Sequence, residues 1–405
     1  MFQRIISRIF RGRHYWRSLS FDQVAELYVS RLVTVFAINV VNLFAAVYLY
    51  KLGYKIEFIA LFYAVLYGLK IPFSIVCAKI AAYYGPKHGI LYANLLRIPS
   101  LIAFALVPVA GEYAFVALVC FGVLQQMAAT LYDLCYLVSF SKVRSVDNTG
   151  KELGTMQIIE RAAKVASPLI GGILASLYTP EATIIVACVA FSLAAIPLFR
   201  SVEPTKTRAK LKLKGFPLRF AVRSIISQTV VGTDFVVSGM TWSLFITLFV
   251  FAHMKDGVYA AIGGLASLGM LISMISAWLF GQLVDRRKGD RLLAAGVVAN
   301  TVIHLFRPFV TTPAGVMGVS IANETATSAY ALPFTRVLFD VADSSGFRIA
   351  YMMCIEMAVN FGAMMACLVL WCLVGMFGVE TGIKTLFVLA AGYELFLLLS
   401  RRAAR

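Results

Sequence analysis

The sequence predicts an all-α integral membrane protein, with twelve transmembrane helices arranged as two pseudo-symmetric six-helix bundles. Three observations lead to this fold class. The composition is too apolar for a water-soluble surface, the apolar runs are long enough to cross a bilayer, and one long basic segment divides the chain at its middle.

The composition indicates that the surface faces lipid. Of the 405 residues, 60% are hydrophobic and 14% charged, and the mean hydropathy is +0.83, whereas soluble domains are about 25% charged. A net charge of +17 would suggest nucleic acid in a soluble protein. Membrane proteins, however, keep Lys and Arg in their cytoplasmic loops. We therefore expect the lipid bilayer as partner and no nucleic acid.

The cysteines and histidines indicate neither a disulfide framework nor a metal site. All seven cysteines lie in apolar runs and none forms a Cys-x-x-Cys pair, which is typical of small buried hydrophobes. The four histidines are far apart in the sequence. We expect no metal and no cofactor.

Each membrane-crossing helix needs about 20 apolar residues, and twelve runs of this kind follow one another. The predicted spans are 29–50, 56–78, 88–109, 113–139, 151–177, 182–200, 220–252, 258–281, 291–310, 315–339, 347–375 and 382–400.

The distribution of basic residues orients these spans. With the N-terminus inside, the inner segments hold 27 of the 37 Lys and Arg, and the outer loops hold four, Lys51, Lys55, Lys255 and Lys384. Positive charge accumulates on the cytoplasmic side of membrane proteins. We therefore expect a multi-pass protein of the inner (cytoplasmic) membrane with both termini in the cytoplasm.

The hydrophilic segments set the domain boundaries. Residues 1–28 form a basic amphipathic arm for the membrane surface, and residues 401–405 a cytoplasmic tail. Residues 29–200 and 220–400 form the two bundles. The linker 201–219 between them is strongly basic, which is typical of a cytoplasmic tether.

An internal repeat relates the two halves. Asp147-Asn-Thr-Gly150 matches Asp343-Ser-Ser-Gly346 at an offset of 196 residues, and Glu160 aligns with Glu356 at the same offset. A duplication explains the match and is typical of secondary transporters. The alternative is that helix starts resemble one another because the same physics shapes them.

Two motifs resemble those of a known family. The loop after span 8 reads Gly281-Gln-Leu-Val-Asp285-Arg286-Arg-Lys, and the loop after span 2 keeps only Gly85 and Lys87 of the same pattern. Span 5 contains Ser-Pro-Leu-Ile-Gly-Gly at 167–172, similar to a motif of antiporters. The chain thus resembles the major facilitator superfamily over nearly its whole length. The resemblance implies a gating role for the loop motifs and two bundles that rock about a central site.

Ionisable residues deep in the spans are expected to have a structural or functional role, because placing each one in the bilayer costs about 3 kcal/mol or more. Those in the first half sum to +2 and those in the second half to −3, which predicts charge pairs between the bundles. The residues are Lys70, Arg97, Asp133, Glu160, Arg161 and Lys164, and then Asp234, Arg307, Glu324, Glu356 and Glu394.

Several of these residues have alternative roles. Glu160 lies four residues before Lys164, so the two can pair on one helix face, and Arg161 either lines the cleft or pairs with Asp133. Glu394 is expected to snorkel toward the cytoplasmic interface.

Three carboxylates are candidates for proton coupling, because desolvation at mid-membrane favours the neutral acid. They are Asp234, Glu324 and Glu356. The alternative for Asp234 and Glu324 is neutralisation by Arg307 or hydrogen bonding to neighbouring helices.

The resemblance implies that spans 1, 4, 7 and 10 line the central cavity, while polar residues there can also simply hold helices together. The candidate substrate-facing residues are Asn39, Gln126, Asp133, Arg161, Asp234, Trp242, Asn323 and Glu324.

These observations predict a monomeric secondary transporter that moves a small organic solute by alternating access, coupled to protons. Efflux is favoured by the span 5 motif, and import of a metabolite is the alternative. The chain contains no P-loop for ATP hydrolysis and no assembled set of catalytic residues, so an enzyme is not expected. The rival classes are a polytopic membrane enzyme and a receptor of transporter shape that moves no solute.

Overall fold

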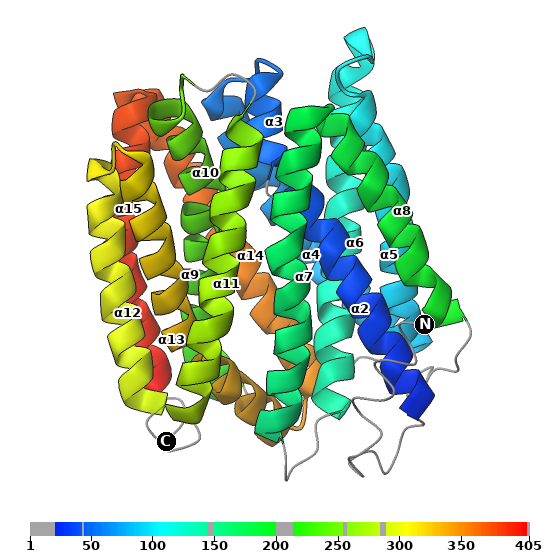
Figure 1. Ribbon diagram of the computed structural model, residues 1–405. Coiled ribbons are helices and arrows are strands. Elements are labelled where there is room, and N and C mark those ends of the chain that lie inside the picture. Colours follow the sequence, from blue (N-terminus) through cyan, green and yellow to red (C-terminus); the bar gives the residue numbers. More distant parts are fainter. Residues whose placement is uncertain are drawn as a thin grey trace.

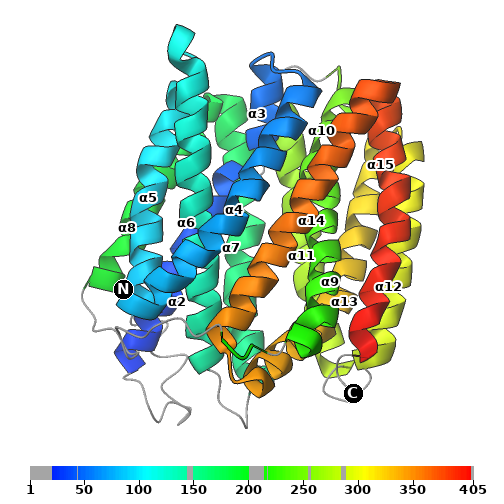
Figure 2. The same ribbon diagram turned by 180° about the vertical axis from the view of Figure 1, so that it is seen from behind.

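The computed structural model describes residues 21–42, 44–143, 149–199, 214–216, 218–253, 257–283 and 289–402, and these residues contain helices and no strand. The helices run side by side in two groups, which are shown from the front in Figure 1 and from behind in Figure 2.

The first bundle comprises the helices before the linker. They are α2 (Phe21–Asn42), α3 (Ala45–Lys51), α4 (Ile56–Tyr84), α5 (Pro86–Leu106), η1 (Gly111–Tyr113), α6 (Ala114–Val143), α7 (Thr149–Leu177) and α8 (Pro180–Phe199).

The second bundle comprises the helices after it. They are α9 (Leu218–Phe235), the π-helix η2 (Val236–Thr241), α10 (Trp242–Phe245), the π-helix η3 (Ile246–Val250), α11 (Val258–Leu283), α12 (Gly289–Phe306), η5 (Arg307–Phe309), α13 (Pro313–Ser345), α14 (Arg348–Phe377), α15 (Val379–Glu394) and η6 (Leu395–Arg402).

The predicted fold class is confirmed. Each of the twelve predicted spans falls on one of these helices or, in spans 1, 4, 7, 9 and 12, on consecutive segments of one rod. Ten stretches of the described chain are long and apolar enough to cross a membrane, and α7 adds a shorter apolar stretch, Ala162–Leu177. The remaining rod, α13, carries Asn323 and Glu324 within its length, and such polar residues lower its mean hydropathy.

Both ends of the described chain lie on one side of the molecule. In Figure 1, α2 and α9 begin, and η6 ends, at the lower end of the bundle. We call this end the terminal side, and the opposite end the far side. An even number of crossings requires this arrangement.

Several predicted features lie outside the described residues. These are residues 1–20 of the arm, residues 147 and 148 of the first repeat motif, residues 201–213 and 217 of the linker, the loop 284–288 with Asp285 and Arg286, and residues 403–405 of the tail. Helix α2 begins at Phe21, so it already covers the end of the predicted arm. Helix α9 begins at Leu218, close to the predicted end of the linker.

Two pairs of helices form the seam between the bundles. Helix α4 packs on α14 (Figure 2), and α7 packs on α11 (Figure 1). The first contact contains a small buried apolar cluster drawn from both bundles, which comprises Ala64, Val236, Ala363, Ala366 and Cys367.

Glycines bring the backbones of α7 and α11 together near the far side. A methyl group built on Gly172 would lie 2.5 Å from the Tyr259 carbonyl oxygen, and one on Gly263 would collide with the Pro168 backbone. The amide of Ala260 also donates a hydrogen bond to Ser176 Oγ across this contact, at 3.1 Å. The glycines of the span 5 motif therefore permit a close helix approach between the two bundles.

Candidate functional site

Charged side chains meet across the seam between α4 and α14. Lys70 Nζ lies 3.2 Å from Glu356 Oε1 and 3.7 Å from Asp133 Oδ2, which belongs to α6. The amide of Asn360 donates a second hydrogen bond to Glu356 Oε1 at 2.8 Å. Lys70 and Glu356 are 8% exposed each. The predicted charge pairing between the bundles is therefore present as one buried ion pair, which we call the seam pair.

A second ionic group lies inside the first bundle. Arg31 of α2 reaches Glu160 of α7 with an Nε–Oε1 distance of 2.9 Å. The Tyr136 hydroxyl donates to the same carboxylate oxygen, and the Arg31 guanidinium lies 3.7 Å from the centroid of the Tyr136 ring. Glu160 is thus held across helices by Arg31, a residue that the sequence analysis did not single out.

Each bundle also buries one arginine against aromatic rings. Arg97 of α5 is 2% exposed and lies 5.4 Å from the Tyr132 ring centroid and 5.2 Å from that of Phe191. Arg307 of η5 is 1% exposed and lies 5.6 Å from the centroid of the Phe387 ring. Stacking on aromatic faces stabilises the guanidinium where water is excluded.

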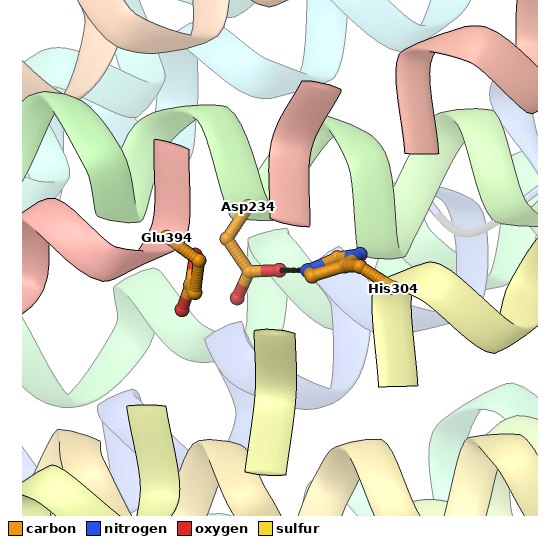
Figure 3. A group of neighbouring side chains, drawn as sticks. All are labelled: Asp234, His304 and Glu394. Atoms are coloured by element: carbon orange, nitrogen blue, oxygen red, sulfur yellow. Dashed lines mark hydrogen bonds and ion pairs between the residues drawn. The ribbon is translucent and has the colours of Figure 1, made fainter. Parts of the chain in front are cut away.

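A third polar group lies in the second bundle, around Asp234 of α9. His304 Nε2 of α12 lies 3.1 Å from Asp234 Oδ1, as Figure 3 shows. Ser238 Oγ donates to the same oxygen at 2.6 Å, and the Tyr330 hydroxyl donates to Asp234 Oδ2 at 2.7 Å. Asp234 is therefore a hydrogen-bonded acceptor rather than the lone carboxylate that one sequence reading expected.

Glu394 of α15 joins this group, and its expected snorkelling toward the interface is wrong. Its side chain turns into the bundle, where it is 2% exposed, and Oε1 accepts a hydrogen bond from Asn300 Nδ2 at 2.9 Å. The reason is that Asn300 and His304 lie one turn apart on α12 and offer Glu394 polar partners inside the bundle. We call Asp234, His304 and Glu394 the core cluster.

Arg307 supplies the positive charge beside the core cluster through an intermediate hydroxyl. Its Nη2 donates to Ser238 Oγ at 3.0 Å and to Asn323 Oδ1 at 2.8 Å. Trp242 contributes a ring face 5.2 Å from the guanidinium, and its indole N–H donates to Ser320 Oγ at 3.2 Å. The structure thus brings three predicted residues, Asp234, Trp242 and Asn323, together around Arg307.

The ligand-type atoms of the core cluster lie within 4.8 Å of one another, close enough for a metal ion. Their existing bonds fit a metal poorly. Both oxygens of Asp234 already accept hydrogen bonds, and the Arg307 cation lies one hydroxyl away. The group is better described as a hydrogen-bonded acid–base cluster.

Among the other predicted site residues, Glu324 lies within electrostatic reach of Arg307, and the rest lie elsewhere. Asn39 bonds to the Val35 carbonyl oxygen of its own helix at 2.8 Å, and Gln126 is half-buried on α6. Glu324 is half-buried against α11, where a methyl group on Gly269 would lie 3.1 Å from its Cγ. The Arg161 side chain falls outside the described side chains.

The first loop motif forms a tight turn at the terminal side. Gly85, with a φ of +91°, ends α4 and precedes α5 directly. This left-handed conformation favours glycine, because other residues lose energy there. Lys87 follows in the first turn of α5 and is 6% exposed. In the second motif, Gly281 lies in the last turn of α11.

His304 was not predicted as a site residue, because no other histidine lies near it in the sequence. A usable signal was present in α12 and η5, where Asn300, His304 and Arg307 recur at helical spacing. Three polar residues on one face of an otherwise apolar span indicate a buried polar core.

Comparison with known proteins identifies what this chain is similar to. The family model described as Major Facilitator Superfamily matches residues 27–366. No curated protein matches the chain significantly.

Several solved structures share the fold at low sequence identity. The nucleoside transporter NupG is 14% identical, with a TM-score of 0.67 over 95% of this chain and 99% of that chain. The human organic anion transporter MFSD10 is 10% identical, with a TM-score of 0.68 over 93% and 99%. A POT family transporter in complex with 5-aminolevulinic acid is 12% identical, with a TM-score of 0.70 over 96% and 99%.

Proposed function

The chain belongs to the major facilitator superfamily, and on that premise we propose that it is a secondary active transporter of a small organic solute. Transport proceeds by alternating access, in which the two bundles rock about their seam. The observation that carries the proposal is the seam pair, Lys70–Glu356, a buried ion pair that joins the two bundles at 3.2 Å.

The seam pair supports this mechanism on energetic grounds. Two charges buried in the bilayer are costly to separate, because each then lies uncompensated in a medium of low polarity. Asp133 lies 3.7 Å from Lys70 and offers the lysine a second carboxylate within its own bundle. Lys70 can therefore exchange Glu356 for Asp133 as the bundles part, so that it always keeps a partner.

Proton coupling is part of the proposal. Asp234, Glu324 and Glu356 are the candidate carriers, and protonation of Glu356 would weaken the seam pair by removing one of its charges. A proton gradient could then favour one orientation of the bundles over the other.

The solute class is a small polar or amphiphilic organic molecule, and efflux is favoured over import on the span 5 motif. The similar structures named above concern a nucleoside, organic anions and 5-aminolevulinic acid, which supports the class but selects no member of it. We propose that the half-buried residues Asn39, Gln126, Asp133 and Glu324, together with Arg161, contact the solute. Trp242 and Asn323 instead hold the Arg307 side chain in position, through the ring face of Trp242 and the amide oxygen of Asn323.

The test uses the purified full-length chain reconstituted in liposomes. Counterflow is measured for a nucleoside, 5-aminolevulinic acid, an organic anion and an amphiphilic cationic dye. We expect at least one probe to exchange, and Lys70→Met or Glu356→Gln to slow that exchange about tenfold or more, as loss of about 1.4 kcal/mol would do.

A matched control is the exposed ion pair of α15, Lys384 Nζ–Glu380 Oε1 at 2.6 Å. Lys384→Met and Glu380→Gln make the same chemical changes away from the seam and should leave exchange nearly unchanged. Failure of every probe in the wild-type protein would contradict the transport proposal. If variants of Lys384–Glu380 slowed exchange as much as variants of Lys70–Glu356, the proposed role of the seam pair would be contradicted.

A further inference from the structure

The first bundle buries a cation whose hydrogen-bond donors are not all satisfied. Arg97 of α5 is 2% exposed, and its Nε and Nη1 have no hydrogen-bond partner among the described residues. The ring centroids of Tyr132 and Phe191 lie 5.4 Å and 5.2 Å from its Cζ atom. Contact with a ring face does not satisfy these N–H groups, because they point outward in the plane of the guanidinium.

The other unsatisfied polar atoms of the first bundle belong to neighbours of Arg97. Within the described part of this bundle, four buried side-chain nitrogen and oxygen atoms lack a hydrogen-bond partner, and they come from Asn94, Arg97 and Tyr132 alone. Asn94 precedes Arg97 by three residues, so both side chains project from one face of α5. Tyr132 lies on α6, which packs along α5 (Figure 2). The unsatisfied atoms are therefore gathered at one place in the bundle.

All four of these atoms are hydrogen-bond donors. They are Asn94 Nδ2, Arg97 Nε and Nη1, and the Tyr132 hydroxyl. The amide oxygen of Asn94 is already used, because it accepts a hydrogen bond from Thr34 Oγ1 of α2 at 3.3 Å. Asn94, Tyr132 and Thr34 are 0% exposed. Buried donors without an acceptor cost free energy, which an acceptor bound among them would recover.

The charges around Arg97 leave one positive charge without a close counterion. Arg31 lies 5.2 Å from the centroid of the same Tyr132 ring, but its charge is balanced by the ion pair with Glu160. Asp133 lies within electrostatic reach of Arg97, yet its carboxylate is close to Lys70 and its side chain is 43% exposed. An uncompensated buried cation is costly in the bilayer. Water would accept the hydrogen bonds but would not balance the charge.

We propose that Asn94, Arg97 and Tyr132 form a binding site for one small monovalent anion, a halide or a carboxylate. Arg97 supplies the positive charge, and the Asn94 amide and the Tyr132 hydroxyl supply neutral donors. Sulfate would bring a second negative charge close to Glu160 and Asp133, so the site should reject it. The anion site does not rest on the proposed transport function.

The anion can come from two sources, free chloride or the carboxylate of a transported solute. The burial of all three residues favours an ion that is small enough to enter alone. Only the second source rests on the proposed transport function.

The test measures anion binding to the purified full-length protein in detergent, without any solute. Chloride, bromide or formate replaces gluconate at constant pH and ionic strength, and the melting temperature is recorded. We expect a saturable rise, because a ligand of the folded state stabilises it, and no rise with sulfate. Radioactive chloride should bind at one ion per chain. A melting temperature that none of the three monovalent anions raises, or that sulfate raises equally, would overturn the site.

Arg97→Met removes the positive charge and should abolish the rise in melting temperature with chloride. Arg336→Met changes an exposed arginine of α13 and is the matched control, with the rise retained. A full response to chloride in Arg97→Met would place the anion elsewhere and overturn the assignment.

A second variant keeps the test decisive if Arg97→Met does not fold. Asn94→Leu removes one donor at similar volume and should weaken chloride binding about tenfold, as loss of about 1.4 kcal/mol would do. Thr34→Val is the matched control, because it breaks the same Thr34–Asn94 hydrogen bond and keeps the Asn94 donor, so the wild-type affinity should remain. Wild-type affinity in Asn94→Leu as well would overturn the site.

The source of the anion is decided by competition in liposomes. Chloride that slows the counterflow of 5-aminolevulinic acid but not that of a nucleoside supports the solute carboxylate as the ligand. Saturable binding of chloride without such competition supports the free ion. Absence of counterflow in the wild type would overturn the transport proposal and leave the anion measurements in detergent as they stand.

Discussion

At the scale of single residues, the buried arginines explain how the two bundles tolerate so many polar groups. Arg97 and Arg307 lie over Phe191 and Phe387, and these phenylalanines are 196 positions apart (387 − 191), the offset of the sequence repeat (343 − 147). The aromatic partner therefore keeps the offset of the repeat, whereas the two arginines are 210 positions apart (307 − 97). The phenylalanines alone are consistent with a duplication.

Arg307 is expected to be the residue on which the polar core of the second bundle most depends. Arg307→Met leaves Asp234 and Glu394 without their cation, and breaking a buried ionic network in this way destabilises proteins by about 3–5 kcal/mol. Thermal unfolding in detergent should shift strongly downward. Arg336→Met changes an exposed arginine of α13 and should have little effect. Equal melting temperatures for the two variants would contradict this role.

At the scale of elements, the contact between α7 and α11 depends on the absence of side chains. Gly172 and Gly263 lie where an added methyl group would meet the facing backbone, whereas Gly264, the next residue, has nothing within 4 Å. Two neighbouring glycines in one helix therefore have opposite tolerance for a side chain. The physical reason is that only one of them faces the other bundle.

Gly263→Ala is accordingly expected to disfavour the state in which the far-side ends of α7 and α11 touch. In a transporter with two orientations, the population should shift toward the state in which these ends part. Spin labels at the far-side ends of α7 and α11 should report longer distances in Gly263→Ala than in wild type. Gly264→Ala is the matched control and should keep the wild-type distances. No difference between the two variants would show that the contact is not limiting.

At the scale of the whole molecule, the two helix contacts that form the seam between the bundles differ in composition. The α7–α11 contact combines close backbone approach at glycines and a hydrogen bond with buried apolar side chains, among them Ala175 and Tyr259. The α4–α14 contact contains the seam pair and a buried apolar cluster, and in the proposed mechanism it opens when Lys70 passes from Glu356 to Asp133.

Bridging the α7–α11 seam should therefore stop transport. Ser176→Cys with Ala260→Cys, in a chain whose exposed Cys120 and Cys372 are replaced by Ser, places two thiols where Ser176 Oγ and the Ala260 amide are now 3.1 Å apart. A short thiol-bridging reagent should abolish counterflow, and reduction of a cleavable bridge should restore it. Either single cysteine variant treated in the same way should remain active. Undiminished counterflow in the bridged protein would exclude opening at this seam.

The linker and both termini are predicted to lie on the cytoplasmic side of the membrane. Basic residues concentrate on the inner segments, so a membrane-impermeant amine reagent should label the linker around Lys210 only in inside-out vesicles. Labelling from the outside of intact cells would reverse the assignment of both termini.

The sequence by itself determined the fold class, the number of spans and the division into two halves. Hydrocarbon thickness sets span length, and backbone groups in lipid must be satisfied within each helix, so these features follow from local composition. The opposite charge sums also predicted an ion pair such as Lys70–Glu356. Only the tertiary structure decided which ionisable groups meet. The inward turn of Glu394, the place of His304 beside Asp234 and the hold of Arg31 on Glu160 depend on helix rotation and on partners far along the chain. No local pattern encodes these contacts, because each is selected by the polar atoms that other helices leave unsatisfied.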